Sequence, residues 1–77
     1  MEDKELTFGE KAVGLTFNPG NNGDVEVVKK LYAEIIDGLD VLRNKEVSPE
    51  TKRLCSIAIT EAQAAQMWAV KAVTWKD

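Results

Sequence analysis

The sequence predicts an all-α protein in which a short N-terminal helix precedes an antiparallel helical hairpin, assembled as a homo-oligomer. Residues 25–42 carry apolar side chains at the spacing of an amphipathic helix. The connection 43–47 is short, so this helix and the one that follows it, 49–74, are expected to be antiparallel neighbours. The later helix is apolar on more sides than one partner helix can cover, which indicates self-association.

The first helix is expected within residues 5–15. Thr7 is a suitable N-cap, and Glu10 follows it by three residues, which is the spacing of a capping box. Residues 16–23, with the sequence TFNPGNNG, are expected to form a loop. Proline fixes φ in this segment, and glycine and asparagine tolerate positive φ, so the chain can turn here.

The second helix is expected over residues 25–42, with Asp24 as its N-cap. Its apolar positions repeat with a period close to that of an α-helix, and they are Val28, Leu31, Tyr32, Ile35, Ile36, Leu39 and Leu42. The third helix is expected from Pro49 to about Thr74. Ser48 is its N-cap, and a proline at the first helical position has no N–H to leave unpaired.

The third helix has apolar side chains on several faces. One line consists of Leu54, Ala58, Ala62, Ala65, Ala69 and Ala72, and a neighbouring line consists of Ile57, Ala64, Trp68 and Trp75. The two tryptophans share a face and are expected to be core or interface anchors. A chain of 77 residues buries only a small core and has little other material to cover this surface. We therefore expect the helix to pack within its subunit and also against copies of itself.

The chain is expected to form one structural unit with two parts. Residues 1–23 are an N-terminal arm with the short helix and a loop rich in glycine and asparagine, and residues 1–4 within it are expected to be frayed. Residues 24–77 are the helical hairpin domain.

Composition disfavours several classes of function. The 10 Lys and Arg against 13 Asp and Glu give a net charge of −3, whereas duplex nucleic-acid binding usually needs a basic face. With no His and one Cys, the chain offers no zinc site and no activated thiol, and Cys55 is expected to be a small buried hydrophobe. No apolar run reaches the roughly 20 residues of a membrane span, and no signal peptide is visible. We expect a cytoplasmic, non-enzymatic protein with no catalytic residue, metal, cofactor or membrane partner.

A small ligand with two or three phosphates is compatible with this charge, because a few Lys, Arg and backbone N–H groups can hold it. The N-terminal arm offers such groups. Phe8 and Phe17 can stack on bases, and Lys11 can meet a phosphate, with Asn18 beside them in the sequence. The alternative is that both phenylalanines simply pack the arm onto the hairpin.

Three further basic residues, at two places in the chain, have two interpretations each. Arg53, in the first turns of the third helix, can clamp a phosphate with its guanidinium fork, or form a surface ion pair with Glu50 or Glu46. Lys29 and Lys30 can serve solubility alone, or join the backbone at the start of the second helix in an anion site.

With these residues in view, the chain resembles the phage-encoded anti-CBASS cyclic-nucleotide sponges, which share a hairpin domain with the anti-Thoeris sponges. The resemblance extends from about Phe8 to Trp75 and rests on the segments FGEKAVGLTFNPG and ITEAQAAQMWAVKAVTW. Its most specific parts are the closing MWAVK segment and the Ser-Ile-Ala-Ile-Thr run that precedes it.

The resemblance implies a hexamer in the cytoplasm of the host bacterium that sequesters cyclic di- and trinucleotides, or related ADP-ribose signals, without cleaving them. It implies a dinucleotide-type pocket between paired subunits, built from an aromatic residue and a Lys of the N-terminal region. We assign Phe8 and Lys11 to this pocket, with Phe17 and Asn18 as alternates. Phenylalanine in place of tyrosine keeps stacking and loses a hydroxyl contact. The resemblance also implies a trinucleotide-type pocket where three subunits meet, with Arg53 as its arginine.

The alternative function is a helical homo-oligomeric protein-interaction module without a nucleotide ligand, because an excess of apolar surface would look the same. Lys11, Arg53 and the glycine-rich arm favour the sponge, since a protein-binding hairpin does not need them. An enzyme that degrades the signal is disfavoured by the lack of His and of a metal cluster.

Overall fold

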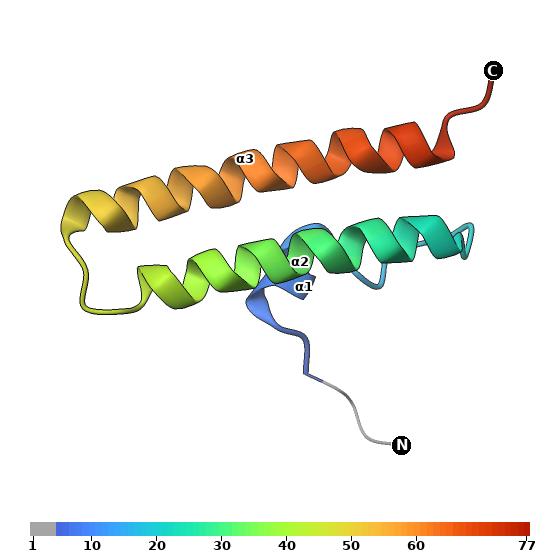
Figure 1. The fold of residues 1–77 in the computed structure, drawn as a ribbon. Helices are drawn as coiled ribbons and strands as arrows, with labels where there is room; N and C mark the ends of the chain where they lie inside the picture. Colours follow the sequence, from blue (N-terminus) through green and yellow to red (C-terminus); the bar gives the residue numbers. More distant parts are fainter. Residues whose placement is uncertain (1–4) are drawn as a thin grey trace.

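In the computed structural model, which describes residues 5–77, the chain forms three helices and, within that range, no strand. They are α1 (Phe8–Val13), α2 (Gly23–Arg43) and α3 (Pro49–Thr74). The long helices α2 and α3 lie side by side and antiparallel, and α1 lies behind α2 in the view of Figure 1. The all-α class, the short first helix and the hairpin are therefore confirmed. The fraying expected for residues 1–4 concerns residues outside the described part of the chain.

Local capping explains where the helices begin. Thr7 and Glu10 form the predicted capping box: the Thr7 side chain accepts from the Glu10 N–H at 3.0 Å, and the Glu10 carboxylate accepts from the Thr7 N–H at 2.9 Å. Ser48 caps α3 and Pro49 is its first residue, as expected. The N-cap of α2 is Asn22 and not Asp24. The Asn22 side chain reaches two N–H groups of the first turn, whereas Asp24 lies inside that turn.

The core draws on all three helices. Its buried members are Val13 of α1, Ala33 and Ile36 of α2, and Ile59 of α3. The buried face of α2 agrees with the predicted one in part. Ile36 is buried, and Tyr32 and Leu39 pack against the core, as predicted. Val25, Lys29 and Ala33 are also buried, which the pattern did not predict. Of the apolar positions predicted for this helix, Leu31, Ile35 and Leu42 are exposed. On α3, Cys55 is buried, as expected.

The approach of α1 to α2 explains this rotation of the buried face. A Cβ added at Gly9 would collide with the carbonyl oxygen of Ala33, so the two backbones meet where both residues are small. The contact places Ala33 and its neighbours toward α1 and turns the larger apolar side chains of α2 away from it. Small residues at a helix contact allow the two backbones to approach closely, and the buried side of α2 is therefore the side that carries Ala33.

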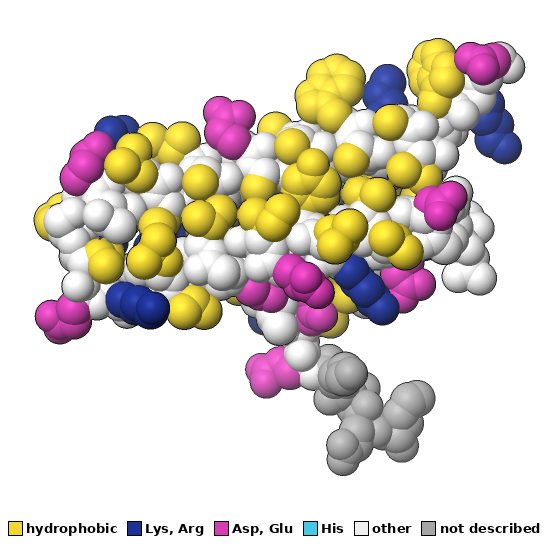
Figure 2. Space-filling view, viewed as in Figure 1, with side chains coloured by type: hydrophobic (Ala, Val, Ile, Leu, Met, Phe, Trp, Pro, Cys, Tyr) yellow, Lys and Arg dark blue, Asp and Glu magenta, His cyan; other side chains and the backbone are white. Residues whose placement is uncertain are grey.

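Both long helices also carry exposed apolar side chains. We call these residues the uncovered face: Val27, Leu31, Ile35 and Leu42 from α2, Leu54, Ile57 and Trp68 from α3, and Trp75 just after the end of α3. On each helix they recur at the three- and four-residue spacing of a single side. Figure 2, in which α1 is on the far side, shows hydrophobic side chains gathered over both helices. Trp68 and Trp75 are 70% and 64% exposed, so they are not core anchors of a single chain.

Within residues 5–77, no helix combines the length and the apolar character needed to cross a bilayer.

Candidate functional site

Phe8 and Lys11 both lie on α1, as the sequence predicted. The Phe8 ring is 44% exposed at the first residue of the helix, and Lys11 is exposed one turn later. Residues three apart on a helix are neighbours on its surface, so an aromatic face and an ammonium group are presented together. The pair can offer a stacking surface and a cation to the same ligand.

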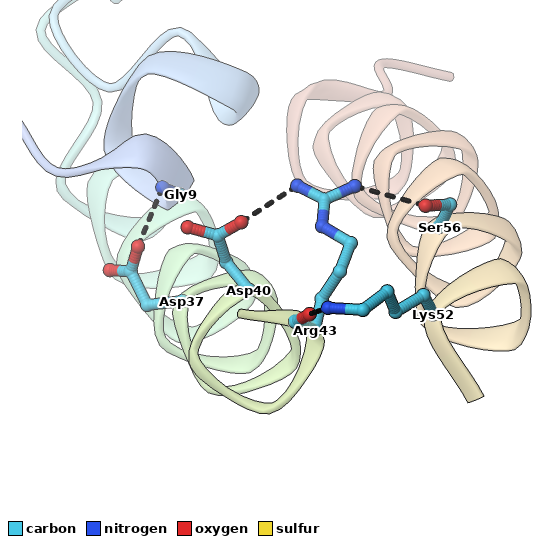
Figure 3. Close-up of polar contacts among 6 residues, drawn as sticks. All are labelled: Gly9, Asp37, Asp40, Arg43, Lys52 and Ser56. Atoms are coloured by element: carbon cyan, nitrogen blue, oxygen red, sulfur yellow. Dashed lines mark hydrogen bonds and ion pairs between the residues drawn. The ribbon is translucent and has the colours of Figure 1, made fainter. Parts of the chain in front are cut away.

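A polar cluster joins all three helices (Figure 3), and its Arg43 side chain contacts Phe8. The guanidinium of Arg43, the last residue of α2, lies 5.4 Å from the centroid of the Phe8 ring. The same group donates to the Asp40 carboxylate at 2.7 Å and to the Ser56 hydroxyl on α3 at 3.1 Å. Cation–π contact, ion pair and hydrogen bond therefore converge on one partly buried side chain.

Two further contacts strengthen this end of the hairpin. The Asp37 carboxylate accepts from the Gly9 N–H at 2.7 Å, so an α2 side chain caps the start of α1. Lys52 on α3 donates at 2.8 Å to the carbonyl oxygen of Arg43, where the last turn of α2 leaves acceptors free. Figure 3 shows Asp37 directed at α1, and Arg43 and Lys52 spanning the gap between α2 and α3.

Phe17 lies in the loop after α1 with its ring 70% exposed. Lys29 of α2 is buried, and its ammonium group donates to the carbonyl oxygens of Gly14 and Phe17. The same group lies 5.5 Å from the centroid of the Phe17 ring. Both interpretations given for Lys29 from the sequence are therefore wrong for this residue, because it acts inside the subunit and holds the loop against α2.

The structure separates the two phenylalanines. Phe8 contacts Arg43, whereas Phe17 contacts Lys29. On α2, Lys29 precedes Arg43 by fourteen residues. At 1.5 Å per residue, these two points on α2 are about 21 Å apart. Within one chain, Phe8 and Phe17 thus belong to different places, and they are alternatives rather than partners in a pocket.

Asn18 has a structural role in the loop. Its side-chain amide donates to the carbonyl oxygen of Asn22 at 2.9 Å and accepts from the N–H of the same residue at 3.1 Å. Asn22 in turn caps α2, so the loop conformation and the start of the helix are linked. Asn18 retains few free groups for a ligand, which leaves Phe17 as the stronger alternate.

Arg53 lies on the surface in the second turn of α3. Its guanidinium forms a two-point contact with the Glu50 carboxylate, through Nε at 3.0 Å and Nη2 at 2.6 Å. These hydrogen bonds lower the pKa of the Glu50 carboxyl below its ordinary value and raise the pKa of the Arg53 guanidinium. An exposed ion pair of this kind contributes little free energy, so a phosphate could replace Glu50 at small cost.

No enclosed pocket occurs within the 5–77 part of a single chain. No group of three or more Cys, Asp or Glu side chains in that part is placed to hold a metal ion. The exposed candidate groups, Phe8, Lys11 and Arg53, are therefore displayed on a surface instead of being enclosed by their own subunit.

The sequence analysis gave no role to Asp40 or Arg43 and gave Lys29 the wrong one, although these polar residues fix α1 and its loop to the hairpin. The signal was present, because they continue the buried line of α2 at three- and four-residue steps from Val25 through Ala33 and Ile36. Polar side chains within a buried line need partners, and here the partners are carbonyl oxygens, a hydroxyl and each other.

A comparison with protein families identifies this hairpin. The family described as Acb2/Tad1, hairpin domain, matches residues 10–74 of the 77. The chain belongs to the Acb2/Tad1 hairpin-domain family. No curated protein and no solved structure matches the chain.

Membership of the Acb2/Tad1 hairpin-domain family indicates the general class to which the protein belongs. This is the anti-CBASS and anti-Thoeris sponge family, whose members sequester signalling molecules. It is not a known family of enzymes. The matched residues include Lys11 and Arg53, whereas Phe8 lies just before the matched segment.

Proposed function

We propose that this protein is a phage anti-immune sponge that binds cyclic di- and trinucleotide second messengers in the host cytoplasm and blocks CBASS-type signalling without cleaving them. Family membership over residues 10–74 carries the proposal. Related ADP-ribose signals of Thoeris-type defence are the second ligand class that this membership suggests. Stoichiometric capture requires no chemistry, which suits a chain without His.

The binding unit that we propose is a homo-oligomer, a hexamer by analogy with the family. Two observations support assembly. The uncovered face exposes large apolar side chains of both long helices, among them Leu31, Ile57 and Trp68. Exposed apolar surface of this kind usually meets a partner. In addition, a single chain encloses no pocket within its described residues, so a ligand would be enclosed only between subunits.

The proposed dinucleotide-type site uses Phe8 and Lys11, with Phe17 and Asn18 as alternates. The Phe8 ring is open to solvent on part of its surface and is held by Arg43, so it can accept a base by stacking. Lys11 is exposed beside it and can meet a phosphate. Asn18 is the weakest candidate, because its amide is engaged within the loop.

The proposed trinucleotide-type site uses Arg53. Its guanidinium is on the surface, paired only with the neighbouring Glu50, and its planar fork fits two phosphate oxygens. Three copies brought together around an axis would repel one another unless anions lay between them. A cyclic trinucleotide supplies three phosphates, which matches a threefold set of arginines.

The second candidate function is a homo-oligomeric protein-interaction module with no nucleotide ligand. The uncovered face favours it, because apolar side chains at helical spacing suit a partner helix equally well. It does not account for the exposed Lys11 and Arg53, which a partner helix would not require.

Titration calorimetry against a panel of cyclic di- and trinucleotides, with linear dinucleotides as controls, separates these functions. After saturation, the complex is heated and the released nucleotide is analysed by chromatography. Binding of at least one cyclic nucleotide with recovery of the intact ligand supports the sponge. Binding followed by recovery of linear products would indicate an enzyme, and no binding of any panel member would reject the nucleotide-sponge proposal.

A further inference from the structure

Arg43 contacts all three helices through one side chain. Its guanidinium lies over the Phe8 ring of α1, pairs with Asp40 of its own helix and donates to Ser56 of α3. The side chain is 27% exposed, so its charge is partly removed from water. A desolvated cation that is satisfied on several sides has a well-defined position.

The position of this guanidinium restricts the Phe8 ring. An exposed aromatic side chain at the start of a short helix would otherwise sample several rotamers. Here one side of the ring is covered by the cation, while 44% of the residue stays accessible. The ring therefore presents a single free side to a ligand.

We infer that Arg43 is a positioning residue of the dinucleotide-type site: it fixes the Phe8 ring and limits stacking to one nucleobase per subunit. The inference rests on the proposed function and adds a residue that lies outside the predicted site. Arg43 acts through Phe8 and not by direct contact with phosphate, because its terminal nitrogens are already engaged by Asp40 and Ser56.

The benefit to binding is pre-organisation. A ring that is ordered before the ligand arrives loses little side-chain entropy on binding. Without the guanidinium, the entropy of ordering the Phe8 ring is lost during binding and lowers the affinity. We expect Arg43→Met to weaken cyclic dinucleotide binding by roughly 2- to 12-fold, which corresponds to immobilising one side chain.

The experiment is a double-mutant cycle measured by calorimetry on the assembled protein. It compares the wild-type chain, Phe8→Ala, Arg43→Met and the double variant. Lys52→Met is the matched control, because it removes one positive charge at the same end of the hairpin and contacts only backbone carbonyls. Arg43→Lys serves as a milder variant that keeps the charge and loses the planar stack.

Spectroscopy of the ligand-free protein gives a second readout. The chain has two phenylalanines, so ring resonances of Phe-labelled protein are few and Phe17 is an internal control. We expect Arg43→Met to shift the Phe8 ring signals and to leave those of Phe17 unchanged. Lys52→Met should move neither set.

The expected pattern is a loss of affinity on Arg43→Met that disappears in the Phe8→Ala background, with Lys52→Met close to wild type. An equal loss in both backgrounds, no loss at all, or the same loss with Lys52→Met would overturn the role of Arg43 while leaving the sponge intact. A wild-type chain that binds no cyclic nucleotide would instead reject the proposed function, and this inference with it.

Discussion

Asp37 and Lys29 lie on the same helix, α2, and hold opposite ends of α1. The Asp37 carboxylate accepts from the Gly9 N–H at the start of α1, and the Lys29 ammonium donates to the Gly14 carbonyl just after its end. Their eight-residue separation spans about 12 Å of helix, close to the length of a six-residue α1 with its caps. An anion at a helix N-terminus and a cation at its C-terminus both favour the helix dipole, so α1 is aligned antiparallel to α2.

We call the contacts of Asp37 and Lys29 with the two ends of α1 a clamp. It predicts that substitutions at the adjacent Lys29 and Lys30 have unequal effects on the free energy of unfolding. Lys29→Met should lower the free energy of unfolding by about 1–3 kcal/mol, because the partly buried carbonyl oxygens of Gly14 and Phe17 lose their donor. Lys30→Met is the matched control. It breaks only an exposed pair with Glu26, and its effect should stay within about 0.5 kcal/mol. Urea unfolding followed by circular dichroism measures both, and equal effects would contradict a clamp at Lys29.

Glycine at position 9 is predicted to be essential for docking α1. In Gly9→Ala the new methyl group meets the Ala33 carbonyl oxygen, which belongs to a rigid backbone, so α1 must move away from α2. We expect a loss of stability of a few kcal/mol, on the scale of an overpacked contact. Gly38→Ala is the control, since outside the surrounding turns of α2 no atom of residues 5–77 lies within 4 Å of that methyl group. Hydrogen exchange of the α1 amides should increase in the first variant only.

The exposed side of α3 offers a test of assembly, because a charge placed there should disrupt contacts between subunits. Ala65 is exposed in a single chain and shares a helix side with Leu54 and Trp68. If copies pack there, Ala65→Glu buries an unpaired charge at a cost on the order of 3–5 kcal/mol, and the oligomer should dissociate. Thr60→Glu, at an exposed position on another side of α3, should leave the assembly intact. Light scattering at micromolar concentration provides the measurement, and a folded wild-type monomer would refute assembly.

Two separate ligand sites predict opposite patterns in two variants. Arg53→Ala should abolish cyclic trinucleotide binding and leave dinucleotide binding nearly intact, because Arg53 lies on α3, apart from α1. Phe8→Ala should weaken dinucleotide binding by about 1–3 kcal/mol, the usual contribution of a stacked base, and spare the trinucleotide. Calorimetry with both ligands gives the answer. If Arg53→Ala removed both ligand classes from an intact oligomer, a single shared site would be indicated.

Acid pH should weaken the contact between Glu50 and Arg53. Hydrogen bonding to Arg53 lowers the Glu50 pKa from its ordinary value of 4.5, so the charged carboxylate favours the folded state. The contribution is present above pH 4.5 and disappears as the pH falls through the lower pKa of the folded state. Glu50→Gln should therefore be less stable than wild type at pH 7, and the difference should shrink toward pH 3.

The sequence by itself determined the elements of this protein. The capping box at Thr7, the Ser48-Pro49 start of α3 and the short connection between the long helices are local signals, and local hydrogen bonding decides them. The same sequence carried the resemblance that family membership confirms. The division at residue 23, the assembly and the roles of Phe8, Lys11 and Arg53 remain predictions.

Only the tertiary structure decided which side of α2 is buried and how α1 is fixed to it. Hydrophobic periodicity placed Leu31 and Ile35 inside, yet Gly9 and Ala33 allow a close backbone approach that turns those side chains outward. Lys29 and Arg43 then lie within the buried line, because carbonyl and hydroxyl groups distant in the sequence, together with the nearby Asp40 carboxylate, satisfy their charges. Periodicity records the polarity of each residue, whereas several of the partners that make a buried charge tolerable are supplied by segments distant in the sequence.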